Sequence, residues 1–175
     1  MKNKFFNNIL LIVLSLGFIG CEDYVDYEAS ENYTIVADDY FKTSADYEAA
    51  LVGTYDVLQW NIYSVMIGDI ASDNSFCGGE SATDVIGMQK IDDMIHVPNN
   101  DQLTSTWKWL YEGINRANYM IENKDKLDFS RKAELYGEVH FLRAYYYFEL
   151  VKIFGDVPLF TDSRLTASDS NTLTR

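Results

Sequence analysis

Cysteine and histidine are the side chains in this sequence that could supply a nucleophile and its base. The chain has two cysteines, Cys21 and Cys77, and two histidines, His96 and His140. A cysteine nucleophile needs a base within hydrogen-bond reach, and no motif brings either histidine next to Cys77. We therefore expect Cys77 to behave as a small apolar residue without a catalytic role.

Carboxylates are the most abundant charged groups, with 27 Asp and Glu against 14 Lys and Arg and a net charge of -13. Glycoside hydrolysis needs two carboxylates set across a cleft, and no motif singles out such a pair. Asp69, Asp73 and Asp84 could form a calcium cluster, but their spacing fits no EF-hand. The acidic balance argues against nucleic-acid binding. We expect no catalytic residue, metal or cofactor, and a surface glycan-degrading enzyme stays as an alternative.

The first twenty residues have the composition of a signal peptide. Lys2 and Lys4 form a basic start, and a short apolar run covers residues 9–19. A membrane-spanning helix needs roughly 20 apolar residues, so this run is too short to span. We expect residues 1–20 to be a lipoprotein signal peptide.

Cys21 follows this run in the context Phe18-Ile19-Gly20-Cys21, which resembles a lipobox. In a lipobox the residue before the cysteine is small, and the cysteine carries the acyl chains of the mature protein. Each buried methylene of such an anchor contributes about 0.8 kcal/mol to membrane binding. We expect Cys21 to be the lipid anchor and residues 21–40, which are acidic and lack periodicity, to be a tether. An ordinary signal peptide followed by a chance cysteine is the alternative.

Helical periodicity dominates the rest of the chain and predicts an all-α fold. Thr43 to Asp46 form a capping-box-like start, and Gly53 inside the following helix suggests close approach by a second helix. Residues 62–70 are apolar and expected to be helical, whereas residues 77–98 have little periodicity and are expected to form a long loop. The stripe of the first helix is Tyr47, Leu51, Tyr55 and Leu58.

A longer helix is expected to begin at Asn100 or Asp101. Its residues recur at spacings of three and four, which indicates one buried face. We expect Trp107 to lie in the core and Asn118 to hydrogen bond between helices. The stripe of this helix is Leu103, Trp107, Leu110, Ile114, Ala117 and Ile121.

The segment from Ser130 to Gly155 predicts the most apolar helix, capped by Ser130 and ended by Gly155. Two apolar faces predict a helix buried almost all round. Arg143 within it needs a partner, and the candidates are Glu138, Glu149 or a carboxylate of another helix. The two faces are Leu135, Val139, Leu142, Tyr146 and Ile153, and Phe141, Tyr145, Phe148 and Lys152.

Residues 137–159 read GEVHFLRAYYYFELVKIFGDVPL, which resembles the signature segment of the SusD/RagB family. The usual pattern is Gly-Glu-Ala-x-Phe-Leu-Arg-Ala, then several aromatics, then Gly-Asp-Val-Pro-Leu. Val139 stands where Ala is commoner, and His140 stands where a basic residue, often Arg, is usual. The segments AALVGTYDVL (49–58) and WKWLYEGINRAN (107–118) are similar to further parts of the family pattern.

The resemblance implies a SusD-like fold of tetratricopeptide-like helix pairs, present here only in its N-terminal part. It assigns residues 41–160 to a SusD-like helical domain and residues 161–175 to the start of a truncated remainder. The implied role is capture of an oligosaccharide, or sometimes a peptide, for a partner SusC-like TonB-dependent transporter. The implied location is the outer membrane, lipid-anchored and facing the exterior. A truncated, non-binding remnant is the alternative.

Sugar capture needs aromatic faces for the rings and amide or carboxylate groups for the hydroxyls. Trp60, Asn61, Asp73 and Asn74 lie at expected helix ends and at the start of the long loop, so they are our candidate ligand-binding residues. Ordinary surface or structural roles are the alternative for each. Aromatic residues make up 15% of the chain, and composition alone favours their use in the core.

Overall fold

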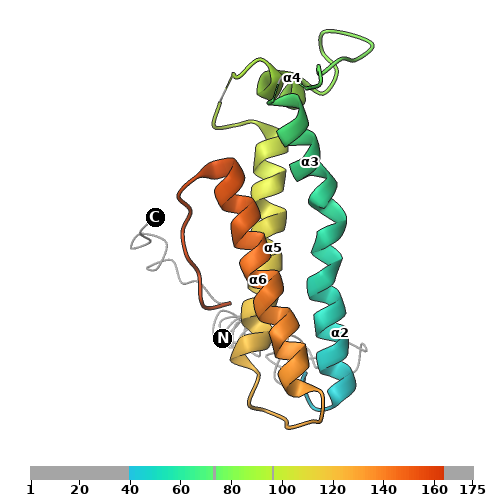
Figure 1. Ribbon diagram of the computed structural model, residues 1–175, viewed down its shortest axis with the longest axis vertical. Coiled ribbons are helices and arrows are strands. Elements are labelled where there is room, and N and C mark those ends of the chain that lie inside the picture. The colour runs from blue at the N-terminus through green and yellow to red at the C-terminus, as the bar shows by residue number, and fades with distance from the viewer. Residues whose placement is uncertain (1–39, 73, 96, 164–175) are drawn as a thin grey trace, which may run out of the picture. The chain divides into compact units, whose positions relative to one another are not determined.

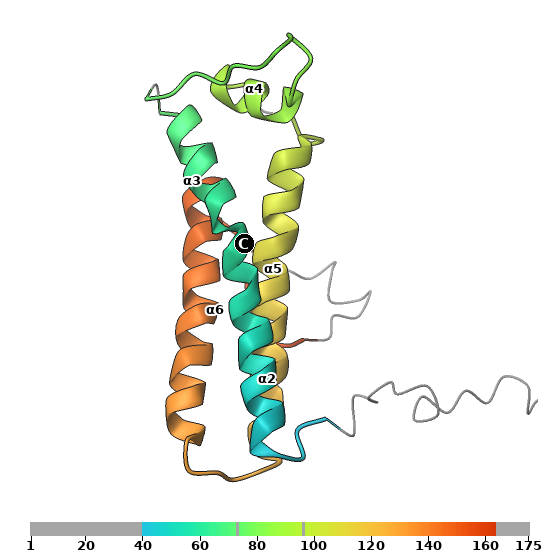
Figure 2. The same cartoon turned by 90° about the vertical axis from the view of Figure 1, so that its right-hand side faces the viewer.

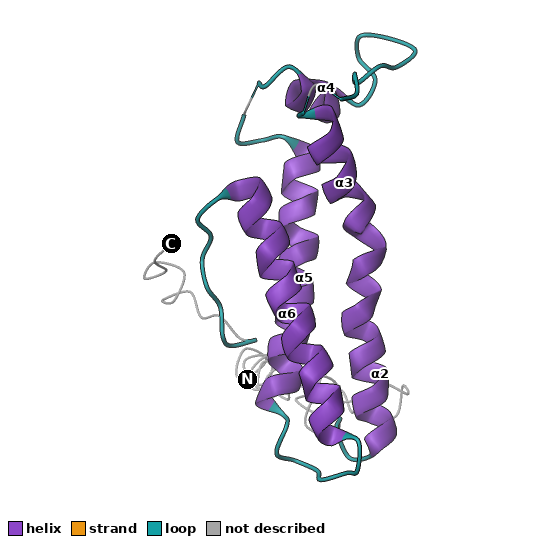
Figure 3. Ribbon diagram, viewed as in Figure 1, coloured by secondary structure: helices purple, strands orange, loops and turns teal. Residues whose placement is uncertain are grey.

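The computed structural model describes residues 40–72, 74–95 and 97–163. The chain divides into residues 1–40 and 41–175 as separate units, and the fold described here is that of the second. Its described residues form helices and no strand (Figure 3), so the all-α prediction is confirmed. In chain order the elements are α2 (Ser44–Tyr55), the 3-10 helix η4 (Asp56–Trp60), α3 (Asn61–Ile70), α4 (Ile86–Asp92), α5 (Asp101–Glu122) and α6 (Lys132–Phe154).

The body of this unit consists of α5, α6 and the successive helices α2, η4 and α3 (Figures 1 and 2). α5 and α6 run antiparallel and side by side, α2 packs against both, and η4 and α3 continue the direction of α2. This antiparallel pair agrees with the predicted helix-pair architecture. The largest fully buried side chains of the unit are Tyr47, Tyr146, Phe41, Ile114, Met120, Leu135, Leu142, Leu150, Val139, Asn118 and Thr54.

Side-chain caps fix where α2 and α5 begin. Thr43 and Asp46 form the predicted capping box, in which the Thr43 amide donates to Asp46 at 2.7 Å. Asn100 caps α5, and its Oδ1 accepts from the amides of Gln102 and Leu103 at 3.0 and 3.2 Å. These caps satisfy amides that have no partner inside their own helix.

α4 lies inside the segment that was expected to be a continuous loop, so that part of the prediction is wrong. Met88 and Ile91 of α4 pack against Ile67 of α3 in a small apolar cluster of their own. A helix of seven residues is too short to show clear periodicity, and it forms because its apolar side chains are buried against a neighbour.

Gly113 marks a close approach between α5 and α6. A Cβ atom at residue 113 would lie 2.6 Å from Cε2 of Tyr146, whereas a Cβ at Gly53 would meet nothing within 4 Å. The expectation that Gly53 admits a second helix is therefore wrong, and Gly113 has that role. Gly53 instead offers its backbone carbonyl to the guanidinium of Arg116.

The two glycines give a matched prediction about stability. Gly113→Ala should lower the free energy of unfolding by about 1–3 kcal/mol, because the new methyl group overpacks against a buried ring. Gly53→Ala should raise it by up to about 1 kcal/mol, since Ala favours a helix more than Gly. Urea unfolding followed by circular dichroism measures both, and a similar change in the two variants would contradict this account.

α6 is buried on one side only, which corrects the expectation of a helix buried almost all round. Leu135 and Val139 are fully buried, but Phe141 and Phe148 are 69% and 60% exposed. Among the described helices, α5 and α2 make the extensive contacts with α6. The helix also begins one residue later than expected, with Arg131 rather than Ser130 at its N-cap.

Residues 157–163, which we call the strap, leave α6 after Gly155 and return along the α5–α6 pair (Figure 1). Tyr111 and Tyr147 donate their hydroxyls to the carbonyls of Pro158 and Phe160, at 2.7 and 2.9 Å. Asn118 donates to Phe160 as well, at 3.0 Å. Side chains of both helices therefore hold the backbone of the strap.

The partner of Arg143 is an amide rather than a carboxylate. Its guanidinium donates to Oδ1 of Asn118 at 2.9 Å, so the interhelical role predicted for Asn118 is confirmed. Glu138 pairs with Arg131 and Glu149 pairs with Lys152. The expected ion pair of Arg143 is not found among the described residues.

Candidate functional site

Two tryptophans and a tyrosine form an aromatic platform where η4 meets α3. Trp60 ends η4 and stacks on Trp109 of α5, with ring centroids 4.6 Å apart and an angle of 14° between the planes. The ring centroids of Tyr63 and Trp109 lie 4.8 Å apart. Trp60 is 39% exposed. The platform, which we define as Trp60, Tyr63 and Trp109, therefore offers an apolar aromatic surface at the solvent boundary.

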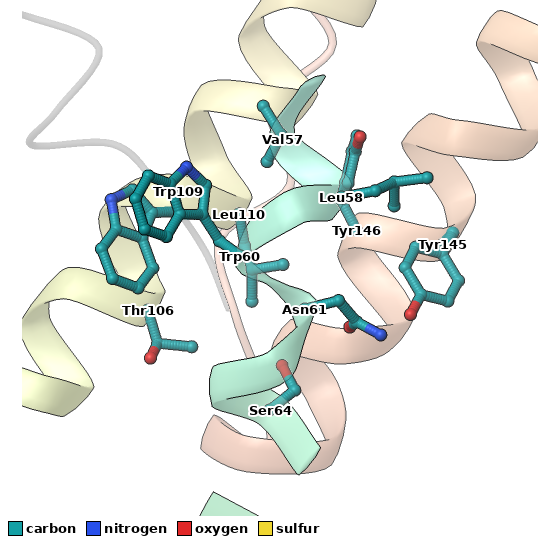
Figure 4. A pocket seen from close by; sticks show the side chains of 10 residues that line it. All are labelled: Val57, Leu58, Trp60, Asn61, Ser64, Thr106, Trp109, Leu110, Tyr145 and Tyr146. Carbon is teal, nitrogen blue, oxygen red and sulfur yellow. The ribbon is translucent and has the colours of Figure 1, made fainter. Parts of the chain in front are cut away.

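A small cavity of about 10 Å³ lies behind the platform, and its volume is close to that needed by one water molecule. Its polar lining comes from three elements: Asn61 and Ser64 on α3, Thr106 on α5 and Tyr145 on α6 (Figure 4). The arrangement places hydroxyl and amide groups behind an aromatic surface, which is the combination that orients small ligands.

Asn61 and Tyr145 are neighbours in this cavity. Burial raises the pKa of the Tyr145 hydroxyl above its ordinary value, the nearby charge of Glu149 raises it further, and the Asn61 side chain lowers it. The hydroxyl therefore keeps its proton at neutral pH and can donate one hydrogen bond. Oδ1 of Asn61 is buried and has no hydrogen-bond partner within the described part of the chain.

The structure brings two of the four predicted ligand-binding residues together. Trp60 and Asn61 are adjacent and both line the small cavity. Asn74 is exposed and lies beyond the far end of α3, so it is not part of this group. Asp73 and the predicted lipid anchor Cys21 lie outside the described residues.

Trp109 and Tyr145 are members of the site that the sequence prediction missed. Trp109 lies outside the apolar stripe of α5, and a tryptophan off the buried stripe is the signal that could have pointed to it. Trp107, which was expected in the core, is only partly buried and lines a different groove of about 540 Å³ beside the strap. The Trp107 ring packs edge-on against the ring of Phe154, with the ring centroids 5.0 Å apart.

The described residues show neither a metal-binding cluster nor a membrane-spanning helix. No three or more His, Cys, Asp or Glu side chains gather there in a way that could hold a metal ion. Among the described helices, none has both the length and the apolar character needed to cross a membrane.

The fold and the platform define the class of protein, which is a helical scaffold that carries a surface suited to ligand binding. Sequence comparison then identifies the family. Residues 24–175 match the profile of the SusD-like family described as starch-binding and associating with the outer membrane. The chain belongs to this family, and the resemblance in its signature segment is confirmed.

Individual relatives agree with this assignment. The chain is 31% identical to the SusD-like protein P38 of Formosa agariphila over 95% of this chain and 33% of that protein. It is 28% identical to the SusD-like protein P25 of the same organism over 91% of this chain and 32% of that protein. The chain thus spans about a third of the length of these curated relatives.

Proposed function

We propose that this protein binds oligosaccharides at the outer membrane and passes them to a SusC-like TonB-dependent transporter. The family description as starch-binding and outer-membrane-associated supports the ligand class and the location. The signature segment at residues 137–159 supports the transporter partner, because that segment is typical of proteins with this role. In this proposal the protein is a lipoprotein, anchored through Cys21 after removal of residues 1–20 and facing the exterior.

The observation that carries the proposal is the stacked pair of Trp60 and Trp109. A sugar ring has an apolar face of C–H groups and a rim of hydroxyls, so it packs on an aromatic plane while its hydroxyls bond to nearby polar groups. Trp60 gives a partly exposed aromatic ring, and Asn61 gives an amide beside it. Stacking on Trp109 holds the Trp60 ring in place before the ligand arrives, which lowers the entropy cost of binding.

Removal of the platform tests the proposal. Trp60→Ala and Trp109→Ala in the full chain should each weaken binding of neutral oligosaccharides at least 10-fold, which corresponds to about 1.4 kcal/mol. Affinity electrophoresis against a glycan panel, followed by calorimetry on the ligands that bind, measures the effect. Phe76→Ala is the matched control, since this ring is 85% exposed and does not line the cavity.

Three results would count against the proposal, each in a different way. Equal losses in the Phe76 control and the platform variants would show that the platform is not the site. No binding to any glycan would favour the non-binding remnant. Release of shortened products from the same glycans would favour a degrading enzyme.

A further inference from the structure

A larger cavity of about 290 Å³ adjoins the small one behind the platform. Ser64 lines both cavities, so they meet at this residue of α3. The larger cavity lies between α3, the start of α5 and the C-terminal turns of α6, with Ile91 of α4 on its wall. Its volume is at the lower end of the roughly 300–1,000 Å³ range of small-molecule sites, so it suits one monosaccharide unit.

Glu149 is the charged group that this cavity buries. It is 3% exposed, and its Oε1 accepts a hydrogen bond from Nζ of Lys152 at 2.6 Å. Its Oε2 is buried and has no hydrogen-bond partner in the ranges that the structure describes. A buried carboxylate oxygen without a donor is costly, and buried polar groups of this kind are usually paired.

The second buried acceptor without a partner in the described ranges, Oδ1 of Asn61, belongs to the same neighbourhood. Tyr145 interacts with both the Asn61 and the Glu149 side chains, but one phenol hydroxyl donates only one hydrogen bond. Oε2 of Glu149 and Oδ1 of Asn61 are therefore left without a donor in the described ranges. A ligand that donates hydrogen bonds would complete the group.

We infer that the cavity beside Glu149 binds one unit of a neutral saccharide, whose hydroxyls donate to Oε2 of Glu149 and Oδ1 of Asn61. This inference rests on the proposed function and adds a specificity to it. A carboxylate oxygen without a donor accepts a hydrogen bond, so Oε2 of Glu149 favours a hydroxyl group of the ligand over the carboxylate or sulfate of an acidic sugar. The unit that follows along the oligosaccharide stacks on Trp60.

Gly68 allows the cavity to be filled without a clash. It lines the cavity, and a Cβ atom there would meet nothing within 4 Å. Gly68→Leu in the full chain should reduce the affinity for neutral oligosaccharides at least 10-fold and leave the unfolding temperature unchanged or higher. Gly137→Leu is the matched control, since Gly137 also has open space around it but lies near the start of α6.

Glu149→Gln separates a ligand-binding role from a structural one. Gln keeps one oxygen for Lys152 and adds an amide donor that can satisfy Asn61 internally. The affinity for neutral oligosaccharides should fall about 10-fold, and the ratio of this affinity to that for uronate-containing oligosaccharides should decrease. The unfolding temperature should not fall. A purely structural Glu149 would give the opposite result, with a lower unfolding temperature and unchanged affinity. Glu134→Gln is the control, because Glu134 is an exposed ion-pair partner of Arg131.

The same titrations separate this inference from the proposed function. If Trp60→Ala abolishes binding but Gly68→Leu and Glu149→Gln bind like the unmodified chain, the cavity is not a saccharide site and the inference is overturned. If the unmodified chain binds no neutral glycan, the proposed function and the inference are both overturned. Loss of affinity in both cavity variants, with both controls unaffected, supports the inference.

Discussion

Asn118→Leu should lower the free energy of unfolding by about 2–4 kcal/mol and free the strap from the helices. Asn118 is fully buried, and its amide donates to the carbonyls of Phe160 and Asp162 at 3.0 and 3.3 Å. Its Oδ1 also accepts a hydrogen bond from the guanidinium of Arg143 at 2.9 Å. Leu has a similar size but bonds to none of these groups, and each unsatisfied buried group costs about 1–3 kcal/mol.

Two measurements check this prediction. Urea unfolding gives the loss of stability, and amide hydrogen exchange at Phe160, whose N–H donates to the Tyr147 hydroxyl at 2.6 Å, reports release of the strap. Asn115→Leu is the control, since Asn115 is exposed on the same helix and should change stability by no more than about 0.5 kcal/mol. Slow exchange at Phe160 in Asn118→Leu would contradict the role assigned to Asn118.

The second large effect should appear at alkaline pH, where the unit should unfold cooperatively as its buried tyrosines ionise. Burial raises the pKa of Tyr111 to about 12 and raises the pKa of Tyr136 and Tyr146 above the usual range. All three hydroxyls donate to backbone carbonyls, Tyr136 to Met120 at 2.9 Å and Tyr146 to Thr54 at 2.6 Å. Ionisation removes these hydrogen bonds and places charge in the core.

The direction of this pH dependence follows from the raised pKa values. The unfolded chain loses tyrosine protons near pH 10, whereas the folded unit keeps them to a higher pH, so stability is fully present below pH 10. It is then lost as the pH rises towards 12 and beyond. The exposed tyrosines should ionise first, near pH 10, and the remaining rise in absorbance at 295 nm should coincide with the loss of circular dichroism at 222 nm.

Tyr146→Phe provides the comparison for this titration. It should raise the pH midpoint of alkaline unfolding, because the variant has one buried hydroxyl fewer whose ionisation destabilises the fold. At neutral pH it should cost about 1 kcal/mol for the lost hydrogen bond. Ionisation of all tyrosines near pH 10 with helical structure intact would show that the core does not hold their protons.

Local features of the sequence predicted helix ends to within one residue, but they did not predict which faces of a helix are buried. The capping box at Thr43 and the stop at Gly155 depend on residues within a few positions, and both lie where expected. The exposure of Phe141 and Phe148 depends on which elements pack against α6. Aromatic side chains on a helix do not identify that partner, so apolar character was mistaken for burial.

The same limit explains the two glycines and the two missed aromatics. Gly53 and Gly113 are both interior to helices, and only the ring of Tyr146 across the interface distinguishes them. Trp60 and Asn61 could be chosen as candidates because they are expected at a helix end. Trp109 and Tyr145 join them from two other helices, and that convergence is a property of packing between segments far apart in the chain.

The fit of Tyr146 over Gly113 has a consequence for how this binding surface can evolve. Trp109 lies one turn before Gly113 on α5, and Tyr145 is the residue next to Tyr146 on α6. The contact that sets how far one helix slides along the other therefore also sets the spacing between an aromatic wall and a polar wall of the site. Ligand preference can change through substitutions at those walls while the contact keeps their spacing constant, whereas a larger residue at 113 would alter both walls at once.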